Sequence, residues 1–173
     1  MKIIIALLAL LLCLNSCAMA PSYETLSDTY IQQQAPEPMQ IVLELPEDAG
    51  LPTVQADSGD RLYQCDGYWI SLQTYPAGDL EKTLQSATGC SMKLLQPLQT
   101  RLGGVDCYDC VWAAAGEGQT QSGRLRLLDD GNHHYVVTVM ADAEQAGQLQ
   151  PQIQALFRSV RLELPSFNLN TGS

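Results

Sequence analysis

The chain has 173 residues, of which 46% are hydrophobic and 16% are charged, and its formal net charge is −10. This length and composition suit one folded domain with a hydrophobic core. Nine Lys and Arg residues stand against nineteen Asp and Glu residues, whereas a nucleic-acid-binding surface must neutralise phosphates with basic side chains. The charge balance therefore argues against a nucleic-acid partner, and against a basic patch that binds anionic lipid headgroups.

An apolar segment lies near the amino terminus. Lys2 is followed by Ile3–Leu14, a run without any polar side chain. The run is too short to cross a bilayer core comfortably as a helix, but it suits the apolar region of a secretory signal. We therefore predict a signal peptide over residues 1–16.

The apolar run leads into Leu14-Asn15-Ser16-Cys17, which resembles the lipoprotein box of bacteria. In such a box the chain is cut before the cysteine, and acyl chains are attached to its sulfur and its new amino group. The resemblance implies lipidation of Cys17 and an anchor in the cell membrane or outer membrane, on the extracytoplasmic side. Asn15 departs from the small or β-branched residue that is usual there. Cleavage after Ala18-Met19-Ala20 and an uncleaved anchor remain as alternatives.

Three further segments are expected after the signal peptide. Residues 17–38 begin with the lipidated cysteine and continue as a flexible tether, because they are rich in Ser, Thr, Gln and Pro. Residues 39–163 are the expected α+β domain. Residues 164–173 are a polar tail.

Turn signals divide the domain into antiparallel strands. Asp66-Gly67, Gly103-Gly104 and Asp129-Asp130-Gly131-Asn132 each separate two runs with strand-like patterns, as the turns of β-hairpins do. The expected strands are Gln40–Leu45, Arg61–Cys65, Tyr68–Tyr75, Leu94–Leu102, Val105–Ala115, Gln119–Leu128 and His133–Ala141. Val111–Ala115 and Tyr135–Ala141 are apolar on both faces, which predicts that they lie in the centre of a sheet covered on two sides.

Two helices are expected in the domain. One spans Asp79–Gly89, with a capping Asp and a terminating Gly. The other spans Asp142–Ser159, with Gln145 completing a capping box, and Pro151 is expected to kink it or to start its second segment. The sequence thus predicts the α+β class, with a central antiparallel sheet of about six strands and helices packed on both faces.

This order of elements, and above all Gly123–Leu162, resembles the PsbP-like fold and, within it, the DcrB-like group of bacterial lipoproteins. The stretch contains a basic and apolar strand, an Asp-Gly turn, the strand Tyr135–Ala141, and a helix that leads into Phe157-Arg158-Ser159-Val160-Arg161-Leu162. Members of this fold are mostly non-catalytic accessory or binding proteins. The resemblance therefore implies no catalytic residue, no metal site and no cofactor, and we expect an envelope protein as the partner.

Four cysteines follow Cys17, namely Cys65, Cys90, Cys107 and Cys110. Outside the cytoplasm, structural disulfides are the best interpretation of such cysteines, and all pairings among the four remain open. In a regular strand the Cα atoms of Cys107 and Cys110 are about 10 Å apart, beyond the roughly 7 Å limit of a disulfide. That pair would therefore need a bulge or a turn.

The alternative use of Cys107 and Cys110 is thiol-redox chemistry or metal binding. Redox cysteines need a nearby positive charge or a helix amino terminus to stabilise the thiolate, whereas Asp106 and Asp109 flank this pair. A zinc site favours a second close pair of Cys or His residues, and neighbouring His133 and His134 point to opposite faces of a strand. We therefore expect a non-enzymatic binding or accessory lipoprotein, with thiol or metal chemistry as the alternative.

Overall fold

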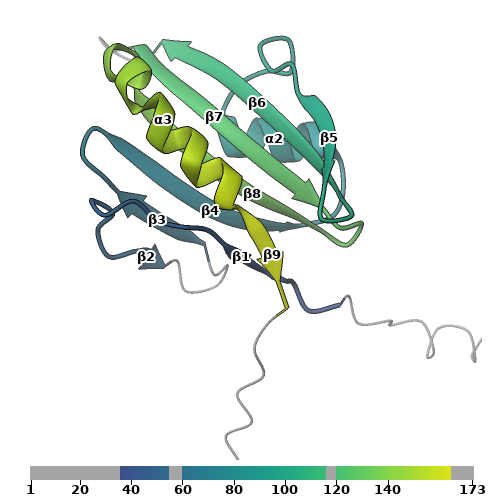
Figure 1. Ribbon diagram of the computed structural model, residues 1–173. Coiled ribbons are helices and arrows are strands. Elements are labelled where there is room, and N and C mark those ends of the chain that lie inside the picture. Colours follow the sequence, from purple (N-terminus) through teal and green to yellow (C-terminus); the bar gives the residue numbers. More distant parts are fainter. Residues whose placement is uncertain (1–35, 55–59, 116–119, 165–173) are drawn as a thin grey trace, which may run out of the picture. The chain divides into compact units, whose positions relative to one another are not determined.

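Seven strands form the main sheet in the part of the chain that the computed structural model describes, which is residues 36–54, 60–115 and 120–164 (Figure 1). Their spatial order is β2-β3-β4-β8-β7-β6-β5, and all neighbours are antiparallel. The bounds are β2 Thr53–Val54, β3 Arg61–Gln64, β4 Tyr68–Pro76, β5 Leu98–Leu102, β6 Val105–Ala115, β7 Thr120–Asp129 and β8 His133–Asp142. β1 (Gln40–Val42) and β9 (Arg161–Glu163) pair with each other in a separate two-stranded sheet. The predicted signal peptide, Cys17, and nearly all of the predicted tether and tail lie outside the described residues.

The three predicted hairpin turns are confirmed. Asp66-Gly67 joins β3 to β4, and Gly103-Gly104 joins β5 to β6. The latter two glycines have φ angles of 59° and 92°, a region that suits a two-residue hairpin and that residues with a Cβ atom rarely adopt. In the turn between β7 and β8, Asp130 Oδ1 accepts hydrogen bonds from the backbone N–H groups of Asn132 and His133. A turn therefore accounts for this acidic segment.

The helices α2 (Leu80–Thr88) and α3 (Ala143–Ser159) occupy the expected positions. Asp79 caps α2, since its Oδ1 accepts hydrogen bonds from two backbone N–H groups of the first turn at 3.0 and 3.4 Å. Asp142 occupies the predicted N-cap position of α3, but its side chain makes no such bond, so only the capping hydrogen bond is absent. α3 continues through Pro151 as one helix, so the predicted second segment does not start there. Pro151 removes one backbone N–H donor from the helix. Packing of the apolar face of α3 against the core stabilises the helix despite this loss. No helix in the described ranges has the length and apolar character needed to cross a bilayer.

Replacing Asp79 by Ala is expected to lower the free energy of unfolding by about 1 kcal/mol, because two N–H groups of α2 lose their acceptor. Asp142→Ala is the matched control, since Asp142 has the same position before α3 but makes no cap bond. Its effect is expected to stay below about 0.5 kcal/mol. Urea denaturation followed by circular dichroism measures both changes. Equal losses in the two variants would contradict this assignment of the cap.

Separate hydrophobic cores lie on the two faces of the sheet. Side chains alternate along β8, so that Tyr135 and Val137 pack on the α3 side and Val136 packs on the α2 side. The α3-side core also contains Tyr63, Tyr68, Ile70, Leu72, Ile153, Leu156 and Phe157, and the α2-side core contains Leu84, Leu95, Trp112, Leu125 and Leu127. Figure 1 shows α3 in front of the sheet and α2 behind it. The predicted α+β fold, an antiparallel sheet with helices on both faces, is therefore confirmed.

Strand positions differ from the sequence-based expectation in several places. The main sheet has seven strands rather than about six, because the short edge strand β2 joins it. β5 begins at Leu98 rather than at Leu94, directly after Pro97, which cannot donate a ladder hydrogen bond. The prediction that Val111–Ala115 lies in the centre of the sheet is wrong, because β6 lies beside the edge strand β5. α3 packs on β7 and β8 and does not cover β6, so the side chain of Val111 is 66% exposed. β1 ends already at Val42 and pairs with β9 outside the main sheet.

Gly123 of β7 lies against the indole ring of Trp112, its partner on β6. A Cβ atom on Gly123 would be 2.3 Å from the ring, and Trp112 is only 4% exposed. Gly123→Ala is therefore expected to lower the free energy of unfolding by about 1–3 kcal/mol. Gly147→Ala in α3, where a Cβ atom would meet nothing within 4 Å, is the control and should stabilise by about 0.5–1 kcal/mol. Thermal unfolding of both variants tests this packing, and an unchanged Tm for Gly123→Ala would contradict it.

Candidate functional site

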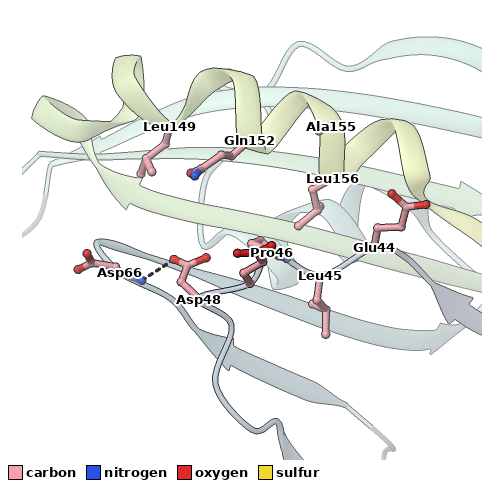
Figure 2. A pocket seen from close by; sticks show the side chains of 10 residues that line it. Glu44, Leu45, Pro46, Asp48, Asp66, Leu149, Gln152, Ala155 and Leu156 are labelled. Carbon is pink, nitrogen blue, oxygen red and sulfur yellow. Dashed lines mark hydrogen bonds between the residues drawn. The ribbon is translucent and has the colours of Figure 1, made fainter.

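A groove of about 660 Å³ lies between α3 and the loop that follows β1 (Figure 2). Its lining residues are Glu44, Leu45, Pro46, Glu47, Asp48, Asp66, Leu149, Gln152, Ala155 and Leu156. We call it the acidic groove, because four of these residues are carboxylates and none is basic. Its volume falls in the range of roughly 300–1,000 Å³ that is usual for ligand sites.

One wall of the acidic groove is a face of α3. Leu149, Gln152 and Leu156 are spaced by three and four residues, so they lie on the same side of the helix. Figure 2 shows their side chains pointing from α3 toward the loop. Leu156 is buried, whereas Gln152 and Ala155 are exposed. This wall therefore has an apolar base and an accessible rim.

The opposite wall is the loop Glu44–Asp48, which hydrogen bonds hold at both ends. The backbone N–H of Glu44 donates to Ser159 Oγ at the end of α3, over 2.9 Å. Asp48 Oδ2 accepts a hydrogen bond from the N–H of Asp66 at 3.0 Å, and Asp48 Oδ1 accepts one from the hydroxyl of Tyr68 at 3.3 Å. The loop is thus tied to α3 and to the β3–β4 hairpin, and the groove is already formed in the free chain.

Negative charge is concentrated on this loop wall. Glu44, Glu47, Asp48 and Asp66 are all exposed. Their carboxylates face an apolar helix wall, so the groove is complementary to a segment with Lys or Arg on one side and apolar side chains on the other. The net charge of −10 adds a long-range attraction for cationic partners.

Beneath the loop wall, the side chain of Tyr68 interacts with both Asp48 and Cys65. Burial, the contact with Cys65 and the negative charge of Asp48 together raise the pKa of Tyr68 well above its ordinary value. Burial also raises the pKa of Cys65, although the hydrogen bond with Tyr68 opposes this effect. Both groups are therefore neutral at pH 7, and the Cys65 thiol is not activated as a nucleophile.

The four candidate cysteines, Cys65, Cys90, Cys107 and Cys110, are buried and have free thiols. Cys107 belongs to the α3-side core and Cys110 to the α2-side core, because residues three apart on a strand point to opposite faces. β6 shows no bulge at this point, since each residue from one cysteine to the other has its own partner on β7. Burial raises the pKa of Cys110 to about 11, and it also raises the pKa of Cys107. The structure thus does not support redox or metal chemistry that uses Cys107 and Cys110 together.

The two neighbouring histidines also point to opposite faces, as the sequence predicts. His134 is 1% exposed, and its Nδ1 lies 2.8 Å from the hydroxyl of Thr83 in α2. Its Nε2 lies 3.6 Å from Asp129 Oδ2. The contact with Thr83 helps to hold α2 against β8, whereas Asp129 belongs to the neighbouring strand β7. Among the described residues, no group of three His, Cys, Asp or Glu side chains is arranged to hold a metal ion.

Sequence reasoning did not identify the acidic groove. The acidic pair Glu47-Asp48 after Pro46 is a local signal, but on its own it is typical of any solvated loop. The groove exists because this loop packs opposite Leu149 and Leu156, which come from the last helix of the domain.

A known structure shares the fold of this chain. The cyanobacterial PsbP protein (CyanoP) of Synechocystis sp. PCC 6803 matches with a TM-score of 0.52 and 6% sequence identity. The match covers 72% of this chain and 92% of CyanoP. The fold is therefore PsbP-like, as predicted, while membership of the DcrB-like group stays a prediction.

Two further structures match with TM-scores of 0.49. LpqN of Mycobacterium tuberculosis, which is involved in cell envelope biogenesis, has 12% identity, and the match covers 76% of this chain and 87% of LpqN. A protein of Bacteroides thetaiotaomicron has 10% identity over 71% of this chain, which spans only 45% of the length of that protein. No protein-family model and no curated protein sequence matches the chain.

Proposed function

We propose that this chain is a membrane-anchored lipoprotein of the extracytoplasmic side, and that its PsbP-like domain is a non-enzymatic binding module. In this proposal the acidic groove holds a cationic, amphipathic segment of an envelope protein. The observation that carries the binding role is the opposition of an apolar helix wall to a loop wall with exposed carboxylates. The anchor rests on the apolar run Ile3–Leu14 and the lipoprotein box that ends at Cys17.

Burial of the thiols supports a non-enzymatic role. A catalytic thiol needs solvent access and a lowered pKa. Cys107 and Cys110 are each 1% exposed, and burial raises the pKa of both. The accessible groups of the groove are carboxylates, the amide of Gln152 and apolar side chains, which suit recognition of a partner.

Replacing Cys17 by Ser is expected to abolish incorporation of a fatty-acid analogue, because the first acyl chains are attached through the cysteine sulfur. In addition, the Cys17→Ser chain should no longer be cleaved before residue 17, and it should be absent from the processed protein in the membrane fraction. Labelling of intact bacterial cells with an alkyne fatty acid, followed by detection of the chain on a gel, measures the effect. Cys13→Ser is the matched control, since Cys13 lies within the apolar run, and it should be labelled normally. Persistent labelling of Cys17→Ser would overturn the anchor.

A synthetic probe tests the binding role of the groove. The probe is a short amphipathic peptide of Lys and Leu, and its counterpart has Glu in place of Lys. Isothermal titration of the purified full chain should detect binding of the Lys/Leu peptide and none of the Glu/Leu peptide. Equal binding of the two peptides, or no binding of either, would contradict the proposed function.

A further inference from the structure

The placement of the four described cysteines restricts which disulfides can form. Cys65 and Cys107 belong to the α3-side core, and Cys90 and Cys110 belong to the α2-side core. The sheet lies between the two cores, so a pair drawn from opposite faces cannot reach disulfide geometry. Only Cys65 with Cys107, and Cys90 with Cys110, remain.

The strand register excludes Cys65 with Cys107. The N–H of Cys65 donates to the carbonyl of Tyr68, at the start of β4. When the residue pairing is followed from Cys107 on β6 across β7 and β8 to β4, it ends at Thr74. Tyr68 and Thr74 are about 20 Å apart along the strand, and β7 and β8 also separate the two cysteines. A disulfide tolerates at most roughly 7 Å between Cα atoms.

Cys90 and Cys110 share the α2-side core, and the path of the chain explains why. Cys90 directly follows Gly89, the residue that ends α2. The segment that begins at Cys90 leads to β5, whose first residue, Leu98, pairs with Asp109. Asp109 is the sequence neighbour of Cys110, so the chain returns from α2 to the part of β6 that carries this cysteine.

We infer that Cys90 and Cys110 form a disulfide when the chain meets a disulfide oxidant, and that Cys65 and Cys107 stay thiols. Two S–H bonds break and one S–S bond forms, while the oxidant, a disulfide such as oxidised glutathione, takes up two electrons and two protons to give two thiols. Cys90, which is 9% exposed, is reached first and forms the mixed disulfide. Cys110, which is 1% exposed, then displaces the carrier thiol. The presence of an oxidant around the chain rests on the proposed extracytoplasmic location, but the pairing itself does not.

Oxidation of the purified full chain tests this pairing. The reduced chain is incubated with oxidised glutathione, the remaining thiols are alkylated, and tryptic peptides are analysed by mass spectrometry. Trypsin cleaves after Lys82, Lys93, Arg101 and Arg124, so the expected bond links the peptide of Cys90 to the peptide that carries both Cys107 and Cys110. Fragmentation of this linked peptide should place the bond on Cys110 and the alkyl label on Cys107.

Two cysteine variants sharpen the result. Cys107→Ser should keep the linked peptide, whereas Cys110→Ser should lose it and retain glutathione on Cys90. A bond from Cys90 to Cys65 or Cys107, or an alkyl label on both Cys90 and Cys110 after oxidation of the unaltered chain, would overturn the inference. Because the unaltered chain already discriminates these outcomes, the test does not depend on whether a variant folds.

The disulfide should also stabilise the fold. It closes a ring of about 20 residues, for which the folding equilibrium constant should rise roughly 300-fold. Urea denaturation of the oxidised and reduced chain measures this gain, which should persist in Cys65→Ser and vanish in Cys90→Ser.

If the bond forms in vitro but the chain isolated from cells under thiol-trapping conditions is reduced, the proposed location is wrong and the pairing stands. If the bond does not form in vitro, the pairing is wrong and the proposed function is untouched.

Discussion

Replacing Asp109 by Leu is expected to lower the free energy of unfolding by about 3 kcal/mol. Arg126 donates two hydrogen bonds to this carboxylate, from Nε to Oδ1 at 2.9 Å and from Nη2 to Oδ2 at 2.8 Å. The side chains of Arg126 and Asp109 are only 15% and 21% exposed. Arg126 Nη1 also donates to the carbonyl oxygen of Phe157 near the end of α3. Loss of the carboxylate leaves a mostly buried guanidinium charge in the contact that holds α3 on β7.

Asp106→Leu is the matched control for this ion pair. Asp106 also lies on β6, but its partner Arg101 is 73% exposed and their closest atoms are 3.4 Å apart. Its loss should cost less than about 1 kcal/mol. Asp109→Leu combined with Arg126→Leu should regain part of the stability, because the combination leaves no unpaired charge. Urea denaturation followed by tryptophan fluorescence measures the three variants, and similar losses for Asp109→Leu and Asp106→Leu would count against the buried pair.

Reversing two charges of the acidic groove, Glu44→Lys together with Glu47→Lys, is expected to weaken binding of the Lys/Leu peptide at least tenfold, or about 1.4 kcal/mol. The reason is that two attractive contacts with lysines become repulsive. Asp48 is left unchanged, since its carboxylate holds the loop to Asp66 and Tyr68. Isothermal titration at low and at raised salt measures the effect, and the parent chain should lose affinity as salt rises because ions screen the exposed carboxylates.

The control for this prediction is Glu81→Lys together with Glu163→Lys. It changes the net charge by the same amount, but neither residue lines the acidic groove. Its affinity for the peptide should stay within a few-fold of the parent value. An equal loss in both double variants would mean that the overall charge of the chain, rather than the groove, attracts the peptide.

Features with a local cause could be predicted from the sequence. The Asp66-Gly67 and Gly103-Gly104 turns are encoded by residues that favour the required backbone angles, and both hairpins are present. The Asp79 cap acts within one turn of helix and is also present. Asp142 has the same local pattern but makes no cap bond, which shows that a capping motif permits a hydrogen bond without ensuring it.

Features that depend on distant segments could not be predicted. Gln40 pairs with Glu163 across almost the whole domain, and no periodicity within either segment indicates this partner. The groove could not be predicted for the same reason. Nothing within the acidic loop, or within the helix that carries the apolar Leu149, indicates that the two lie opposite each other. The opposite orientations of Cys107 and Cys110 follow from strand alternation, but that Cys90 lies on the face of Cys110 depends on where α2 crosses the sheet.

The binding role of the acidic groove is tested most directly by NMR. The ¹⁵N-labelled full chain is titrated with the Lys/Leu peptide while the backbone amide shifts are followed. The expected result is that the largest shifts occur at the loop Glu44–Asp48, at Asp66 and along Leu149–Leu156 of α3, the elements that form the groove. Shifts concentrated elsewhere, for example at the exposed edge strand β5, or no shifts at all, would contradict the groove as the site of recognition.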